Sequence, residues 1–501
     1  MIKRVVIIGG GISGLTAGIF AQKNGFESII LEKHHTMGGE CTGWDRENYH
    51  IDGCIHWLVG TKEGTPIRRL WESVGALDGV EIHHPESFLA FEYQDITVNF
   101  YRDLERLKSS WLEISPNDRS SIEEFCSAIK KLQSFQMPVG KPMDLMNIFE
   151  KIQFMASMKD IGPIMQKYSK LGIQELAGKF KHPALRGAIN SFMPDGDFSA
   201  ISILFPLGTF TGNQSSIPYG GSKAMAMRMV DKYISLGGQV ETSCEVMDLT
   251  IKGRQVNKIN CRNGKSFTGD YFIVACDAKV LYDRLLKGKY NDPKFQKRYN
   301  NPKDYPLASN IYVGIGYEGT MDDIPRTLRF PVNSININQN DKPIEHLQMT
   351  HYAYEKEFAP KGHSVVTFAI NQFEPELTAW EKLVKDKEQY KQEKNRIGRE
   401  VIKAMETRFP YMKGKLKLLD VASPQTYQRY CNAYRGAFMG FWPTLSGKSL
   451  THTGKIKGLK NLMLSGQWLQ PPGGLPVALI TGKDTIMRLC KKEKIKFEGL
   501  N

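Results

Sequence analysis

Three glycines near the amino end of the chain have the spacing of a site that binds phosphate groups. They follow a β-branched run at residues 5–8 and stand at Gly9, Gly11 and Gly14. In this pattern the first glycine permits a tight turn, the second lets the backbone approach a pyrophosphate, and the third allows close packing of helix on strand. The N–H groups at the start of that helix, where Ser13 lies, are free to hold an anion. These residues therefore predict a dinucleotide site.

The elements around the glycines form a βαβ unit. A helix is predicted over residues 15–25 and a second strand over residues 28–32. The second strand ends in Glu32, 18 residues after Gly14, where such units place an acid that accepts hydrogen bonds from a ribose hydroxyl, and Lys33 follows it. Because all the parts come in order, we favour a bound dinucleotide over a tight turn that holds no ligand.

A glycine pair, Gly38 and Gly39, follows Glu32 before any second helix begins. At these residues the chain resembles the FAD-dependent amine oxidase and phytoene desaturase superfamily, in which such a pair lines the cofactor passage. The resemblance implies FAD as a permanently bound cofactor. Members of that superfamily usually carry an arginine after the pair, whereas this chain has Glu40. A cationic contact near the flavin is therefore missing or supplied by another residue.

A second polar run narrows the resemblance. Asp52, Ile55, His56 and Trp57 stand in an arrangement similar to that of the retinol saturase and carotenoid isomerase branch. His56 is the first candidate for a proton donor beside the flavin, and the alternative is a packed histidine bonded to a backbone carbonyl. Tyr430, which follows a Ser-Pro-x-Thr run, is the second candidate, and the alternative there is a packing aromatic.

The carboxyl end supplies further residues to the cofactor site. A predicted strand over residues 462–465 leads to a glycine and a glutamine, and a Pro-Pro-Gly-Gly turn then opens a helix. The resemblance implies that this helix points its amino end at the flavin, where its dipole would stabilise negative charge. It also implies that a valine after the Gly-Gly turn at 237–238 touches the adenine through its backbone. The residues so assigned are Val246, Gly466, Gln467, Gly474, Leu475 and Val477.

A chain of 501 residues exceeds what one hydrophobic core normally organises, so two domains are expected. We predict an α/β fold with a Rossmann-like FAD-binding domain of the glutathione reductase and amine oxidase type. Its partner would be a discontinuous α+β substrate domain with a helical cap. The FAD-binding domain is assigned to residues 1–78, 215–288 and 450–490, and the substrate domain to residues 79–214 and 289–449.

Composition excludes several classes of function. The net charge of +14 comes without a zinc-ligand spacing, an RNA-binding signature or a basic arm, so no nucleic acid partner and no metal are predicted. The eight cysteines include no C-x-x-C pair, and we see no signal peptide, which together favour a cytoplasmic location. No stretch reaches the roughly 20 apolar residues of a membrane span. A Ser-His-Asp set is also absent, so hydrolysis has no support.

Residues 137–193 have a texture of their own. They hold seven of the 20 methionines, and basic residues are spread among the apolar ones. Such helices suit a peripheral membrane contact or an adaptable lid over an apolar ligand, and the alternative is an ordinary cap whose methionines pack inside. Just before this block, Ser121 and Glu124 have the spacing of a capping box, which predicts a helix that begins there.

The resemblance implies an oxidoreductase that uses FAD on C=C or CH–CH bonds of a long apolar substrate such as a carotenoid, a retinoid or an unsaturated lipid. Saturation, desaturation and redox-neutral isomerisation could share this one site, and the first two need an external reductant or electron acceptor that the sequence does not identify. One alternative is a flavin oxidase of a small amine or amino acid in the same superfamily. Another is a flavoprotein that binds lipid without catalysis.

Overall fold

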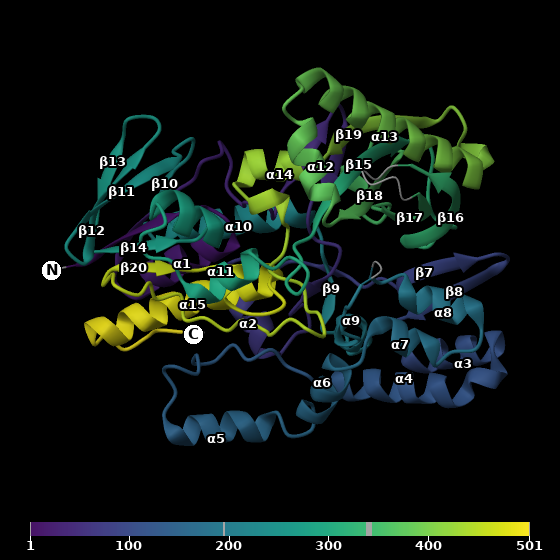
Figure 1. Ribbon diagram of the computed structural model, residues 1–501, viewed down its shortest axis with the longest axis horizontal. Helices are drawn as coiled ribbons and strands as arrows, with labels where there is room; N and C mark the ends of the chain where they lie inside the picture. The colour runs from purple at the N-terminus through teal and green to yellow at the C-terminus, as the bar shows by residue number, and fades with distance from the viewer. Residues whose placement is uncertain (1, 194–195, 337–342, 500–501) are drawn as a thin grey trace.

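The computed structural model describes residues 2–193, 196–336 and 343–499. A five-stranded parallel sheet, which is the predicted Rossmann-like unit, lies on the left of Figure 1. Its strands come from the start, the middle and the end of the chain. Their order is β10 (Gln239–Glu241), β2 (Glu27–Leu31), β1 (Arg4–Ile8), β14 (Tyr271–Val274) and β20 (Leu462–Leu464).

Both faces of this sheet are buried, which explains why β1 is an unbroken β-branched run. Val5 and Ile7 pack into a core with the helices on one face, and Val6 and Ile8 pack into a second core on the other face. The first face carries α1 (Ile12–Lys23), α2 (Pro66–Ser73), α10 (Gly221–Ser235) and α15 (Gly474–Glu493). The second carries α11 (Pro293–Tyr299) and a small sheet of β11 (Val246–Lys252), β12 (Gln255–Cys261) and β13 (Ser266–Thr268).

The first and last of these helices touch backbone to backbone. A Cβ on Gly482 of α15 would lie 2.6 Å from the carbonyl oxygen of Ser13 in α1, so only glycine permits this approach. Next to it, the hydroxyls of Ser13 and Ser465 form a hydrogen bond of 2.7 Å. The two ends of the polypeptide are therefore joined at the carboxyl edge of the sheet, where β1 and β20 end.

A seven-stranded sheet forms the second part of the molecule. Its order is β19 (Leu416–Ala422), β15 (Ser309–Tyr317), β18 (Ser364–Gln372), β17 (Ile344–His351), β16 (Thr327–Ile335), β7 (Ser87–Tyr93) and β8 (Ile96–Tyr101). Helices α12 (Glu376–Leu383) and α13 (Lys387–Arg408) cover one face (Figure 1) and bury its alternate side chains. The opposite side chains of the central strands are therefore left to face the interior of the molecule.

A helical layer closes the space below this sheet. It consists of α3 (Leu104–Ile114), α4 (Arg119–Leu132), α5 (Ile148–Ser157), α6 (Gly162–Ser169), α7 (Ile173–Gly178), α8 (Pro183–Asn190) and α9 (Ile201–Thr211). The predicted start of α4 is wrong. The helix begins at Arg119, directly after a turn at Pro116, and the hydroxyl of Ser121 donates to the carbonyl of Lys179 instead of capping the helix.

Shorter elements connect the layers. They are β3 (Gly43–Arg46), β4 (Tyr49–Asp52), β5 (Leu58–Val59), β6 (Ile82–His83), β9 (Ser215–Pro218) and α14 (Pro424–Cys431). Each large sheet draws its strands from the segments assigned to one predicted domain. Side chains such as Phe295 and Leu307 nevertheless pack into the core behind the parallel sheet, so the domain boundaries stay a prediction. None of the helices in the described ranges is long and apolar enough to cross a membrane.

Candidate active site

One continuous cavity of about 1160 Å³ runs from the glycine turn of β1 to the seven-stranded sheet. Its lining includes the carboxyl edge of the parallel sheet, the loop after the glycine pair, the helical layer and the strands of the second sheet. Residues predicted to bind the cofactor are thus brought together with residues from every other layer. Those that line the cavity are Gly9, Gly11, Ser13, Glu32, Gly38, Gly39, Glu40, Gly466, Gln467, Gly474 and Leu475.

The glycine turn leaves open space where the pyrophosphate is expected. Gly9 has a φ of +109°, and a Cβ on Gly14 would lie 2.0 Å from its carbonyl oxygen, so both positions require glycine for packing. A Cβ on Gly11, in contrast, would meet no atom closer than 3.8 Å and would project into the cavity. Gly11 is therefore free of a side chain on the side where a ligand would approach, and the cradle fits a dinucleotide.

Glu32 is held in place by the backbone. Its carboxylate accepts hydrogen bonds from the N–H of Gly10 at 2.6 Å and from the N–H of His34 at 2.8 Å. Burial raises the pKa of this carboxyl, and the two N–H donors oppose that rise. The side chain is 7% exposed and lines the cavity beyond the glycine turn, the place expected for the ribose.

The glycine pair continues the same surface. Gly38 and Gly39 both have positive φ angles, +114° and +61°, and the N–H of Gly38 donates to the carbonyl of Gly10 at 2.9 Å. A Cβ on Gly39 would lie 3.2 Å from the Cα of Gly11. The pair therefore lets a second loop lie against the glycine turn without covering its open side.

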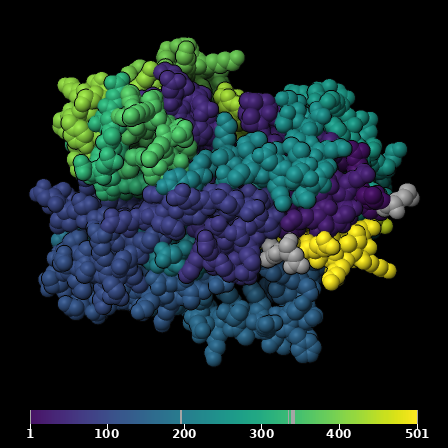
Figure 2. All heavy atoms as spheres, turned by 180° about the vertical axis from the view of Figure 1, so that it is seen from behind, coloured from purple at the N-terminus to yellow at the C-terminus, as the bar shows by residue number. Residues whose placement is uncertain are grey.

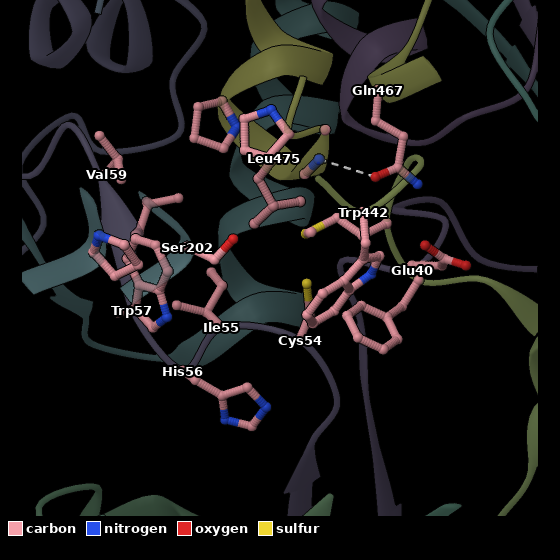
Figure 3. Close-up of a pocket in the computed structure, with 18 of the residues that line it drawn as sticks. Glu40, Cys54, Ile55, His56, Trp57, Val59, Ser202, Trp442, Gln467 and Leu475 are labelled. Atoms are coloured by element: carbon pink, nitrogen blue, oxygen red, sulfur yellow. Dashed lines mark hydrogen bonds between the residues drawn. The ribbon is translucent and has the colours of Figure 1, made fainter. Parts of the chain in front are cut away.

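Glu40 is a buried carboxyl in the wall of the cavity, where Figure 3 shows it next to Gln467. Its Oε1 is buried and has no hydrogen-bond partner among the described residues. Burial and the nearby charge of Asp277 raise the pKa of Glu40 from 4.5 to about 8. At neutral pH this position therefore holds a largely protonated acid.

Asp277 is a site residue that the sequence argument missed. Its carboxylate accepts from the N–H of Lys279 at 2.7 Å and of Tyr434 at 2.8 Å, and burial raises its pKa to about 6. The signal was its position shortly after β14, because ligands of open α/β sheets bind at the carboxyl ends of the strands.

The carboxyl-terminal segment completes the cofactor wall. The side-chain oxygen of Gln467 accepts from the N–H of Gly474 at 3.0 Å (Figure 3), which ties the strand end to the start of α15. Gly474 and Leu475 reach the cavity, so the amino end of the helix lies at its wall. Because Gln467 accepts from the N–H of Gly474 and Pro476 has no N–H, Leu475 is left with the backbone N–H of this stretch. Val477, one turn further, is buried inside the helix packing and does not line the cavity.

Four other predicted residues lie outside the lining. Gly14 packs against the carbonyl oxygen of Gly9. The ammonium of Lys33 donates to the carbonyl of Arg429 at 2.6 Å, and the carbonyl of Val246 accepts from Arg284 at 3.2 Å. Tyr430 is 43% exposed and stands edge-on to the ring of His34 at 5.2 Å. We therefore leave Tyr430 out of the catalytic set that we propose below.

His56 lines the cavity on the side remote from Leu475 (Figure 3). Its Nδ1 is buried and has no hydrogen-bond partner in the part of the chain that the structure describes. Burial and the charge of Arg326 lower the pKa of His56 to about 4, so the imidazole is neutral at pH 7. It is therefore not a histidine bonded to a backbone carbonyl through that nitrogen, and a ligand can reach it.

The rest of the cavity has two unlike walls. The helical layer, β7 and the loops before β5, α5 and β20 contribute an apolar wall of aromatic and methionine side chains. The central strands of the seven-stranded sheet contribute a mixed wall, in which polar side chains such as Arg329, Gln348 and Thr350 stand beside apolar ones such as Ile344 and Ile370. The apolar wall comprises Trp57, Phe88, Phe135, Met137, Met165, Phe192, Met193, Phe205, Phe210, Phe438, Met439 and Trp442.

Comparison with known proteins decides the family. The model of the flavin containing amine oxidoreductases matches residues 12–485. The chain belongs to this family. It is an FAD-dependent oxidoreductase, and we propose the cradle described above as its FAD site.

Individual relatives are distant. The chain is 21% identical to human all-trans-retinol 13,14-reductase over 87% of this chain and 77% of that protein. It is 20% identical to prolycopene isomerase 1 of an Oncidium hybrid cultivar over 86% of this chain and 74% of that protein. An oxidoreductase from Methanosarcina mazei shares the fold, with a TM-score of 0.60 and 13% identity over 97% of this chain and 100% of that one.

We expect Gly11→Val and Glu32→Ala each to yield colourless protein. The valine would fill the open side of the glycine turn, and the alanine would remove the acceptor for the ribose. Visible flavin absorbance and FAD released per chain measure the effect. Gly162→Val is the matched control, because a Cβ there meets no atom within 4 Å. Either variant with wild-type flavin content would contradict the assigned site.

We also expect Glu40→Gln to change how the stability of the apoprotein depends on pH. The folded state binds the proton of Glu40 more tightly than the unfolded state, so this stabilisation is complete below pH 4.5 and is lost as pH rises through about 8. The difference in melting temperature, variant minus wild type, should therefore increase from pH 5 to pH 8 and stay constant above pH 8. Glu113→Gln, at an exposed position of α3, is the control. A constant difference across this range would refute the protonated state.

Proposed function

We propose that this enzyme acts on carbon–carbon double bonds, or the corresponding CH–CH bonds, of a long unsaturated substrate. The observation that carries the proposal is that the FAD cradle and a chamber with an apolar wall form one cavity. Relatives named for retinol and for prolycopene support the same class of substrate. The outcome is saturation, desaturation or redox-neutral isomerisation, and an external reductant or acceptor completes the first two.

The chain positions the substrate and keeps water away from the reacting carbons. When bound, FAD supplies a ring that accepts or returns a hydride. Leu475 and the amino end of α15 lie in the cavity wall at the predicted flavin position, and the positive end of the helix dipole favours negative charge there. The aromatic and methionine wall holds an apolar chain while adapting to its shape. Desolvation by this wall strengthens every polar contact inside the cavity.

His56 is the residue that we propose to handle a proton. It lies in the cavity wall with a buried, unpartnered Nδ1 among the described residues, and its ring is neutral at pH 7. A neutral imidazole can accept a proton at one nitrogen and give one from the other. Saturation of a double bond needs such a proton, whereas a purely structural histidine would not face the chamber.

The two alternatives fit less well. A small amine or amino acid would contact little of the apolar wall that lies beyond the FAD cradle in this cavity. A flavoprotein that only binds lipid would need neither a neutral histidine in the chamber nor a helix amino end at the flavin position. The experiment below separates all three.

We expect anaerobic photoreduction of the enzyme, followed by addition of all-trans-retinol, to restore the oxidised flavin spectrum if the enzyme saturates polyenes. A change in the cis–trans composition of the lipid without reoxidation would identify isomerisation. His56→Gln should retain flavin and slow its reoxidation. The control Glu113→Gln should retain flavin and be reoxidised at the wild-type rate. Reoxidation by a small amino acid's imine and by no lipid would favour the amine oxidase alternative, and inertness to every compound would favour the binding role.

We further propose that α5 contacts an anionic membrane surface. The helix buries none of its residues, and Ile148, Phe149, Ile152 and Met155 are each at least 60% exposed. It projects from the lower edge of the molecule in Figures 1 and 2. Exposed Lys151 and neighbouring lysines add the positive charge that anionic headgroups attract.

The position of α5 also supports delivery of substrate from that surface. The segments on either side of the helix, through Met137 before it and Met165 after it, line the cavity. The predicted helical lid and the predicted interfacial surface are therefore parts of one segment. A cytoplasmic location for the enzyme stays a prediction.

Phe149→Ser combined with Ile152→Ser should weaken binding to vesicles that contain phosphatidylserine by about tenfold or more, because each side chain loses roughly 2 kcal/mol of apolar burial. Co-sedimentation at low and high salt measures the binding, and added salt should weaken it for the wild type. Tyr411→Ser, at another exposed aromatic, is the control. Equal binding by the double variant would remove α5 as the contact.

A further inference from the structure

The alternation of side chains along β16 and β17 explains why polar residues line the sheet wall of the cavity. Leu328 of β16 and Met349 of β17 pack into the core beneath α13 and do not line the cavity. Their neighbours Arg329, Gln348 and Thr350 therefore point the other way and line the cavity. A chamber built only for a hydrocarbon would not need this face, because apolar side chains could have filled it.

Two arginines stand on this wall, Arg326 just before β16 and Arg329 within it. In the described ranges neither forms an ion pair, and Nε and Nη2 of Arg326 and Nε of Arg329 are buried without a hydrogen-bond partner. Arg326 donates to the hydroxyl of Thr327 at 3.3 Å and lies over the ring of Tyr354 at 5.7 Å, and Arg329 donates to the carbonyl of Ser191. Both guanidinium groups therefore keep unused donors next to the cavity.

Their charge is felt by the surrounding histidines. Burial is the main cause of the low pKa values of His56 and His346. The charge of Arg326 lowers the pKa of His56 further, and the charge of Arg329 lowers that of His346. A carboxylate that could have neutralised Arg326, that of Asp52, instead accepts from the hydroxyl of Ser222 at 2.5 Å and from its N–H at 2.6 Å. Buried, uncompensated positive charge is costly, and a bound anion would remove that cost.

We propose that the substrate is an amphiphile whose compact anionic head group, a carboxylate or a phosphate, binds Arg326 and Arg329. Its unsaturated chain then lies along the aromatic and methionine wall toward Leu475 and the flavin. This inference rests on the proposed function and narrows its substrate class. It separates the enzyme's substrate from pure hydrocarbons, which have no group for the sheet wall to bind.

The geometry suits such a ligand. Residues 326 and 329 are about 10 Å apart along the extended chain at roughly 3.3 Å per residue, and both line the same cavity. Gln348 pairs with Arg329 across the strands and offers an amide to the same oxygens. His56 lines the same cavity and is close enough to Arg326 for that charge to lower its pKa, so a head group at Arg326 would also bring the ligand near the proposed proton-handling residue.

The test compares matched acids and alcohols on the flavin-loaded enzyme. Oleate is paired with oleyl alcohol, and geranylgeranyl phosphate with geranylgeraniol, and binding is followed by the fluorescence of Trp57 and Trp442 in the cavity wall. In the wild type at least one anion should bind about tenfold or more tightly than its alcohol, because hydrogen bonds between charged groups exceed those of neutral ones. The pair in which the anion exceeds its alcohol more in affinity identifies the head group as a carboxylate or a phosphate.

Variants locate the site. Arg326→Met and Arg329→Met should each weaken binding of the preferred anion by about tenfold and leave the alcohol unchanged within about twofold. Arg326→Lys keeps the charge and should retain part of the affinity, and Arg119→Met, on the exposed side of α4, is the matched control. Melting temperature and flavin content report whether each variant folds, and the wild-type comparison needs no variant.

Equal affinity of the wild type for acid and alcohol in both pairs would overturn the head-group site while leaving action on double bonds intact. L-leucine binding as tightly as oleate would also overturn it, since a small carboxylate would then suffice. If the anions bind as expected but no lipid changes the redox state of the flavin, the head-group site stands and the proposed function fails.

Discussion

The structure depends on a close backbone contact between three glycine-lined segments. The turn at Gly9–Gly14, the pair at Gly38–Gly39 and the end of β20 meet at one edge of the parallel sheet, and the Ser13–Ser465 hydrogen bond joins the first and last of them. A side chain at Gly14 would clash with the carbonyl oxygen of Gly9, and one at Gly482 with that of Ser13. Either side chain would therefore force these backbones apart. The cofactor site therefore exists only once both ends of the chain are folded together.

The same edge opens into the substrate chamber without a partition. One wall of that chamber comes from the helical layer and is apolar, and the other comes from a sheet whose opposite face is covered by α13. Because strand side chains alternate, covering one face with α13 commits the other face to the cavity. Arg329 lies on this face and Arg326 lies just before β16, and a chamber for hydrocarbon alone would leave their donors that lack a partner among the described residues without a ligand. Shape and charge thus support one amphiphilic ligand.

Local patterns predicted much of this from the sequence. The βαβ unit, the role of Gly11 as an open position and the start of a helix near Gly474 follow from neighbouring residues, and the structure places them at one cavity. Other features depend on packing between distant segments. Ser121 bonds Lys179 instead of capping a helix, Tyr430 turns to the surface, and the inward direction of Arg329 is decided by which face of the sheet α13 covers. None of these has a local signal.

A crystal structure of the FAD-loaded enzyme soaked with all-trans-retinoic acid tests the central claim most directly. The account predicts the pyrophosphate beside Gly11, a carbon of the polyene in contact with the flavin ring near Leu475, and the carboxylate against Arg326 or Arg329. Density for the polyene outside this cavity, or for the flavin anywhere but the glycine cradle, would contradict it.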